Sequence, residues 1–177
     1  MFHFQNLDEK TRQYMLIEVE QATKTSQLHS SKRFNDTGRA EYPKLLREAV
    51  ANGNEQTLAA ALQQHNCFLT HEKQGAVTRK VPENAHLTFA EGEFNAFYMR
   101  GICHRAIGEG HMVEVYRAKE AVAPRTASKL IEGNLEDPHR VLLLLKNSLD
   151  GSQRGNGMPA GSNSGLSLRL TTNPIKR

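Results

Sequence analysis

Residues 87–110, LTFAEGEFNAFYMRGICHRAIGEG, are the stretch that decides the fold. Large apolar side chains recur in it three or four residues apart, which is the spacing of one buried helix face. The candidate core residues on this face are Phe94, Phe97, Tyr98 and Ile102. Thr88 and Glu91 have the spacing of a capping box. The pattern predicts a long core helix over about residues 89–108.

Shorter amphipathic stretches flank this helix on both sides. They predict helices over residues 7–24, 41–52, 55–65 and 138–150. Pro43 falls in the first turn of the second of these helices, where its missing N–H costs nothing, and Gly53 and Asn54 supply a stop and a new N-cap. The helices at 41–52 and 55–65 are therefore expected to form a tight helical hairpin.

β-structure is expected to be a small part of the protein. Residues 111–118 alternate Val113 and Val115 with polar neighbours, which predicts one short strand. Residues 67–87 are irregular and polar, with a short strand or an extended arm as the alternatives. We therefore expect a mainly α protein, a small helical bundle with one short β segment and an extended C-terminal arm.

The C-terminal arm is predicted from a change in composition. Residues 151–165, GSQRGNGMPAGSNSG, have the composition of a linker. Leucines then alternate with polar residues at the period of a half-buried strand. We expect a domain over 1–150 and an arm over 151–177 whose strand pairs with a neighbouring subunit. Its partner-binding residues would be Leu166, Leu168, Arg169 and Leu170.

Two consequences of that arm are expected. The three leucines would fill pockets of the partner, while Arg169 faces solvent or an acidic neighbour. Deletion of residues 152–177 would leave a folded domain that no longer assembles.

Composition limits the classes to which the protein can belong. The net charge of +4 comes from 23 basic and 19 acidic residues spread along the chain, which is not a basic stripe. The longest apolar run, VLLLLK, is too short to span a membrane, and the first residues lack the features of a signal peptide. Two cysteines are too few for a disulfide scaffold. A soluble protein made in the cytoplasm, without a membrane partner, is expected.

Candidate chemistry is sparse. His65, Cys67 and His71 have side chains that suit zinc, but a structural zinc site needs four ligands and no second pair stands nearby. Surface histidines are the favoured interpretation, so no metal is expected. Phosphate-binding, dinucleotide and nucleophile-elbow motifs are lacking, so neither a cofactor nor a catalytic residue is predicted. Gly101, inside the core helix, indicates close packing of a neighbouring element.

The helical hairpin at 41–65 has a second interpretation as a DNA-reading helix-turn-helix. Its second helix offers Gln56, Gln63 and Gln64 to bases but has no Arg or Lys. Phosphate contacts would depend on four residues of the preceding segment and the first helix, namely Lys32, Arg33, Arg39 and Lys44. A phage-encoded DNA-binding regulator is therefore kept as an alternative function.

Most of the chain resembles a family of tailed-phage and prophage proteins. The segments that carry the resemblance are LDEKTRQYMLIEVE (7–20), SKRFNDTGRAEYPKLLREAVANGNEQTLAAAL (31–62), AEGEFNAFYMRGICHRAIGEG (90–110), VEVYRAKEA (113–121) and NSGLSLRL (163–170). The expected architecture is similar to that of helical neck proteins, the head-to-tail connectors or adaptors of tailed phages.

The resemblance implies a structural virion protein, not an enzyme, located at the head-tail junction. It implies a homo-oligomeric ring, typically twelve-fold, that contacts the portal and other neck or tail proteins, with packaged DNA in its channel. The strand at 111–118 and the short helical hairpin depart from a long adaptor helix pair. A capsid accessory protein is therefore a further alternative.

Overall fold

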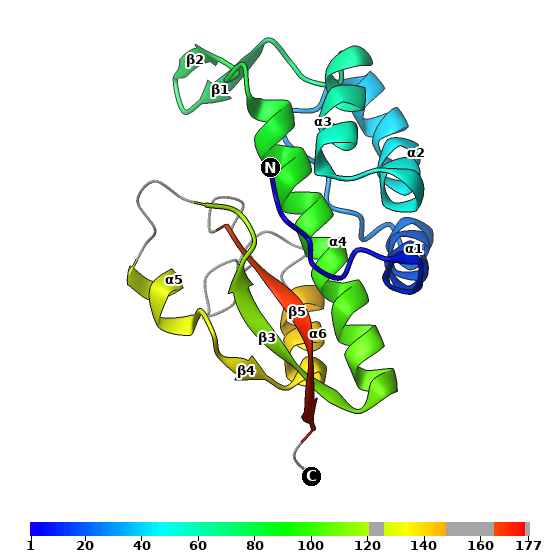
Figure 1. The fold of residues 1–177 in the computed structure, drawn as a ribbon. Helices are drawn as coiled ribbons and strands as arrows, with labels where there is room; N and C mark the ends of the chain where they lie inside the picture. Colours follow the sequence, from blue (N-terminus) through cyan, green and yellow to red (C-terminus); the bar gives the residue numbers. More distant parts are fainter. Residues whose placement is uncertain (121–125, 148–164, 176–177) are drawn as a thin grey trace.

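A computed structural model of the protein describes residues 1–120, 126–147 and 165–175. Helix α4 (Ala85–Glu109) runs through the middle of the molecule, with α1, α2 and α3 on one side and a small sheet on the other (Figure 1). The mainly α fold expected from the sequence is confirmed. The core residues predicted on α4 are fully buried: Phe94, Phe97, Tyr98 and Ile102.

The three N-terminal helices each begin at a residue whose side chain caps the first turn. They are α1 (Glu9–Lys24), α2 (Asp36–Asn52) and α3 (Glu55–Gln64), capped by Asp8, Asn35 and Asn54. Such side-chain oxygens satisfy N–H groups that have no partner inside the helix. Helices α1 and α3 pack on α4, and α2 packs on α1 and on α3.

Helix α2 begins five residues earlier than predicted. Asn35 Oδ1 accepts a hydrogen bond from the Gly38 N–H at 2.8 Å, so the helix starts at Asp36. Pro43 consequently lies inside the helix and not in its first turn. Because proline has no N–H, the Arg39 carbonyl lacks its donor within α2.

Helix α4 also begins earlier than predicted, and the capping box is wrong. The Ala85 N–H bonds to the Pro82 carbonyl and the Thr88 N–H to the Asn84 carbonyl, which places Thr88 inside the helix. Glu91 is buried and accepts a hydrogen bond from Lys119 Nζ. Thr88 and Glu91 have the spacing of a capping box, but the helix already begins at Ala85, so Thr88 is not its N-cap.

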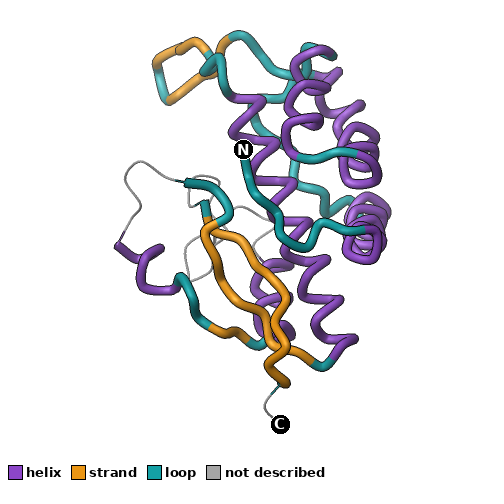
Figure 2. The backbone as a smooth tube through the Cα atoms, viewed as in Figure 1, coloured by secondary structure: helices purple, strands orange, loops and turns teal. Residues whose placement is uncertain are grey.

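The β part is larger than one short segment (Figure 2). Strands β1 (His71–Gln74) and β2 (Val77–Lys80) form a hairpin, and the three-stranded sheet has the order β4-β3-β5. Its strands are β3 (His111–Arg117), β4 (Leu135–Glu136) and β5 (Leu166–Pro174), all antiparallel. Helices α5 (Thr126–Ile131) and α6 (Pro138–Asn147) complete the described chain, and α6 packs on α4.

Strand β5 pairs with β3 of its own chain, which corrects the prediction that it pairs with another subunit. Leu166 stands opposite Arg117, and Leu168 opposite Val115. Both leucines are fully buried in the core that α4 builds. The sequence showed no hairpin partner next to β5, but β3 offers an open edge fifty residues earlier in the chain.

The neighbouring residues of β5 also contact this chain. Leu170 is half-buried against the same core, and Arg169 donates to Glu114 Oε1 at 2.6 Å. Residues 165–175 thus belong to the sheet of the domain, so the expected boundary at residue 150 does not separate them from it. Most of the predicted linker, 151–164, and the predicted end of the last helix, 148–150, lie outside the described residues.

A buried amide fixes β5 against α4. Asn95 Nδ2 donates to the Leu166 carbonyl at 2.9 Å, and Ser167 Oγ donates to Asn95 Oδ1 at 2.6 Å. These bonds give hydrogen-bond partners to a buried backbone carbonyl and a buried hydroxyl on the edge of β5 that does not pair with β3. The docking of β5 is therefore specified by polar contacts as well as by leucines.

The N-terminal segment covers part of the sheet and of α4. The ring of Phe4 packs at a tilt against those of Phe94 and Tyr98, with ring centroids 5.4 and 4.5 Å apart. The Phe2 N–H donates to the buried carboxylate of Glu55 at 2.8 Å. None of the helices that the structure describes is both long enough and apolar enough to cross a membrane.

Candidate interaction surface

The β1–β2 hairpin projects from one end of the molecule (Figure 1). Its strands are joined through Gly75, whose φ of 64° suits a two-residue hairpin turn. Every strand residue is exposed except Glu72, which is half-buried. A two-stranded hairpin with no buried face is marginally stable in water by itself. The hydrophobic core that stabilises the domain therefore contributes little to the stability of the hairpin.

A bidentate ion pair holds the hairpin to the domain. Arg33 Nε and Nη2 lie 2.8 and 2.7 Å from the two carboxylate oxygens of Glu72. The hydrogen bonds of this pair raise the pKa of Arg33 and lower that of Glu72. Paired planar geometry of this kind fixes orientation better than a single contact does. It sets the direction in which the exposed hairpin leaves the domain.

The two faces of the hairpin differ. Side chains alternate along a strand, so the face opposite Glu72 carries His71 and Lys73 of β1 together with their cross-strand partners Lys80 and Thr78. Arg79 lies opposite Glu72 on the other face, so the face turned away from Glu72 carries two cations, Lys73 and Lys80, and no carboxylate. This face is thus a basic, fully exposed surface.

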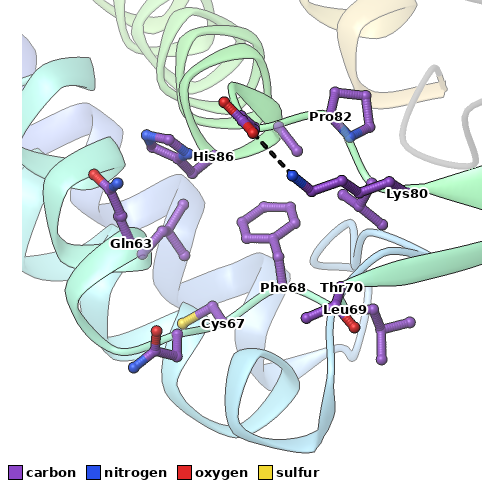
Figure 3. A pocket seen from close by; sticks show the side chains of 13 residues that line it. Gln63, Cys67, Phe68, Leu69, Thr70, Lys80, Pro82 and His86 are labelled. Carbon is purple, nitrogen blue, oxygen red and sulfur yellow. Dashed lines mark hydrogen bonds and ion pairs between the residues drawn. The ribbon is translucent and has the colours of Figure 1, made fainter.

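A pocket of about 240 Å³ lies at the base of the hairpin, between the end of α3 and the start of α4 (Figure 3). The ring of Phe68 lies in its middle, and His86 and Gln63 stand on one side. Lys80 Nζ reaches across from β2 to Glu83 Oε1 at 2.9 Å. The pocket and the basic face share Lys80, so the hairpin and its base form one continuous surface.

The predicted metal candidates do not come together. His65 lies 3.9 Å from a carboxylate oxygen of Glu41, His71 contacts Thr70, and Cys67 is buried. Burial and the nearby charge of Glu41 raise the pKa of the Cys67 thiol. Among residues 1–120, 126–147 and 165–175 no cluster of three or more histidine, cysteine or acidic side chains could hold a metal.

Helix α4 carries an unusual number of buried polar side chains, and each contacts a different part of the chain. Glu93 accepts from His29 Nδ1 at 2.7 Å and from the Tyr42 hydroxyl at 3.2 Å. Arg100 donates to the Leu145 carbonyl of α6 and lies over the ring of Phe97. Together with Glu91 and Asn95, these residues tie the surrounding elements to α4. Sequence analysis did not predict these contacts, because their partners lie far away in the chain.

Burial makes the second cysteine inert as well. Cys103 is fully buried on α4, and desolvation, with smaller effects from the charges of Glu18 and Asp137, raises the pKa of its thiol. The thiolate is the reactive form of cysteine, so Cys103 acts as a small apolar core residue.

Glu18 of α1 forms a buried charge cluster with α4 and α6. Its Oε1 lies 2.6 Å from His104 Nε2 and 2.8 Å from Lys146 Nζ. Burial acts to raise the pKa of the Glu18 carboxyl, but the hydrogen bonds and positive charges of its two partners outweigh burial and lower it. The folded protein therefore holds this carboxylate ionised more firmly than the unfolded chain does.

The lowered pKa of Glu18 predicts a pH-dependent contribution to stability. Its contribution is fully present above the unfolded pKa of about 4.3 and is lost as the pH falls through the lower folded pKa. Glu18→Gln should cost roughly 1–3 kcal/mol at neutral pH, and the cost should shrink in acid. Urea unfolding across the pH range measures this difference. Glu20→Gln, exposed on the same helix, is the control, and a pH-independent cost for Glu18→Gln would contradict the assignment.

Three of the four cations proposed for a helix-turn-helix have other surroundings in the structure. Arg33 pairs with Glu72, Arg39 lies 3.0 Å from Asp36, and Lys44 lines a groove between α1 and α2. The exposed glutamines of α3, Gln63 and Gln64, have no Arg or Lys on their own helix. The geometry does not supply the cationic recognition helix that base and phosphate contacts require.

The sequence predicted either a short strand or an extended arm within residues 67–87, and the exposed hairpin lies in this segment. The available signal was a turn-forming glycine, Gly75, followed by Val77 and Thr78, two residues that favour strands. Comparisons add no relative, since no protein-family model matches the chain and neither curated proteins nor solved structures give a significant match.

Proposed function

We propose that the protein is a structural component of a tailed-phage particle, placed at the head-tail junction, and that it docks on a neighbouring virion protein through the β1–β2 hairpin. The resemblance of its sequence to tailed-phage proteins supports the class of function. The single observation that supports the docking element is the hairpin itself. It is paired along both strands, it lacks a buried face, and the Arg33–Glu72 ion pair fixes the direction in which it leaves the domain.

The exposed hairpin suits assembly better than catalysis. A catalytic site needs polar groups that converge on a substrate in a concave site. In this chain the buried polar groups of α4 are bonded to other elements of the fold, as Glu93 is to His29 and Tyr42. An exposed hairpin can instead lend its strand edges and its side chains to another protein. The proposal therefore assigns the protein no reaction.

Removal of the hairpin tests the proposal. Thr70 and Val81 are already joined by a backbone hydrogen bond of 2.9 Å, so two glycines can replace residues 71–80 without disturbing the domain. The variant should keep its thermal transition within a few degrees, because all the deleted residues except the half-buried Glu72 are exposed and none belongs to the hydrophobic core. It should be lost from purified tailed particles, as measured by quantitative mass spectrometry.

Localisation and a control complete the test. The tagged full chain should label the head-tail junction in electron micrographs of the particles. Gln13→Ala, on the exposed side of α1, should enter particles as the parent chain does. Label elsewhere, or normal incorporation of the chain without its hairpin, would show that the proposal is wrong.

Nucleic-acid binding is a second candidate, favoured by the basic face of the hairpin. Lys73 and Lys80 on this face could contact phosphates without reading bases. Deletion of residues 71–80 also distinguishes the structural role from nucleic-acid binding. If DNA affinity of the full chain falls steeply with salt and is lost with residues 71–80, the regulator is favoured. Particle incorporation that persists without any DNA affinity favours the structural role.

A further inference from the structure

Glu55 is a buried carboxylate of which only one oxygen is bonded. It is the first residue of α3, where the helix dipole favours the ionised form of an acidic side chain. The residue is 1% exposed, and its Oε1 accepts a hydrogen bond from the Phe2 N–H at 2.8 Å. Its Oε2 is also buried and has no hydrogen-bond partner among the residues that the structure describes. A buried carboxylate is costly unless a cation and further donors face it.

The cation that would balance Glu55 is not supplied by a side chain of the described ranges. No Lys, Arg or His side chain there bonds to the carboxylate. Lys119 lies near the same segment, with Nζ 6.0 Å from the centre of the Phe2 ring, but this ammonium group bonds to Glu91 Oε1. The atom in contact with Glu55 is the backbone nitrogen of Phe2, which as an amide provides one donor and no charge.

Packing of the N-terminal segment begins at this nitrogen. Phe2 is 7% exposed, and its ring stacks on that of Phe4 with centroids 5.2 Å apart. The His3 N–H donates to the Ala118 carbonyl at 2.6 Å, and the segment then runs beside α4 towards α1 (Figure 1). Met1, in contrast, is 72% exposed. The folded protein would therefore lose little packing without Met1.

Hydrolysis of the Met1–Phe2 peptide bond would turn the amide into a cation. Water adds across the bond, methionine leaves with the new carboxylate, and Phe2 keeps the nitrogen as an α-amino group, which is mainly protonated at neutral pH. The reaction consumes one water molecule and no oxidant or reductant. The resulting ammonium group has three N–H donors in place of one, so the same nitrogen can bond to both oxygens of Glu55. A charge-assisted pair of this kind is stronger than a hydrogen bond from a neutral amide.

We propose that the Met1–Phe2 bond is a processing site, cut by an aminopeptidase, and that Glu55 receives the α-ammonium group of Phe2. The cut precedes docking of the segment, because the folded protein holds the Phe2 nitrogen buried against Glu55. Docking then forms an ion pair between Phe2 and α3, which fixes the segment that covers α4 and the sheet. This inference goes beyond the proposed structural function and does not depend on it.

A cycle of four chains tests the ion pair. Two chains carry the parental Glu55, one with Met1 and one that begins at Phe2, and both are released from an N-terminal fusion by a protease that cleaves directly before the first residue. The other two carry Glu55→Gln. The parental chain that begins at Phe2 should melt roughly 3–10 °C higher than the chain with Met1. The gain should vanish with Glu55→Gln, because the buried ammonium group then faces no anion.

Equal melting temperatures of the two parental chains, or an equal gain with Glu55→Gln, would overturn the inference. Two matched variants exclude other causes. Met1→Gly, released from the same fusion, removes the exposed side chain but keeps the peptide bond, so it should melt as the chain with Met1 does. Glu9→Gln removes an exposed carboxylate at the first position of α1, and the gain from a start at Phe2 should persist in it. A Met1→Gly chain that melts as high as the chain that begins at Phe2 would contradict a role of the ammonium group.

Mass spectrometry of the intact protein tests the processing itself. Untagged protein isolated from its natural source should lack Met1, and its first peptide should begin at Phe2 with a free amino group. Protein that retains Met1, or that carries an acyl group on the Phe2 nitrogen, would overturn the proposal. The structural function would be unaffected by that result, because it depends on the hairpin and not on the N-terminal segment.

Discussion

A chain that ends at Ser164, without β5, is expected to lose its cooperative thermal transition. Deletion of the strand removes Leu166 and Leu168 from the core. Truncation of one buried leucine costs about 2–5 kcal/mol, and a domain is stable by only about 5–15 kcal/mol. Deletion also leaves Asn95 without Ser167 and bares the edge of β3. Circular dichroism during heating, with near-ultraviolet spectra for packing, measures the loss.

Two further variants make this prediction specific. A chain that ends at Ile175 keeps all of β5 and should melt as the full chain does. Leu168→Ala should cost about 2–5 kcal/mol, whereas Thr172→Ala, at an exposed position of the same strand, should cost little. A sharp transition in the chain that ends at Ser164 would restore the interpretation of β5 as an arm that the domain does not need.

Gly101→Val is expected to separate α1 from α4 and to unfold most of the protein. A Cβ atom at Gly101 would lie 2.6 Å from Met15 Cγ and 3.1 Å from the Thr11 carbonyl oxygen. Met15 is fully buried, and the carbonyl belongs to the backbone of α1, so neither can move alone. Overpacking of a rigid core costs about 1–3 kcal/mol even for small additions, and valine adds three carbons here. Urea unfolding measures the cost.

Gly108 offers the matched control on the same helix. A Cβ atom there would meet only the Tyr14 hydroxyl, at 3.6 Å, which is an ordinary contact. Gly108→Ala should therefore be neutral or should stabilise the protein by up to about 1 kcal/mol, because alanine favours a helix over glycine. Equal effects at the two positions would show that helix propensity, and not the contact with α1, decides the result.

Local patterns predicted the helices of the described chain except the short α5, although α2 and α4 begin earlier than predicted. The periodicity of Phe94, Phe97 and Tyr98 located α4, and Gly53 with Asn54 located the turn between α2 and α3. The close approach expected at Gly101 is present. These features depend on residues a few positions apart, so one stretch of sequence contains the whole signal.

Features that join distant parts of the chain could not be predicted in the same way. The alternation of Leu166 and Leu168 identified a strand, but it carried no information about which edge the strand joins. The partner, β3, is identified by burial against α4 and by Asn95, whose amide happens to face the outer edge of β5. The hairpin was left open as a strand or an arm because β1, HEKQ, has no apolar residue and so lacks the alternation that usually marks a strand.

The pairing of β5 with β3 also bears on how the protein folds. Val113 and Leu170 must meet across more than fifty residues of intervening chain, a closure that costs entropy before any contact offsets it. The helices around α4 form from nearby residues, so β5 is expected to dock last. Until it docks, β3 presents an open edge beside apolar side chains, and newly made chains are most prone to aggregate in that interval.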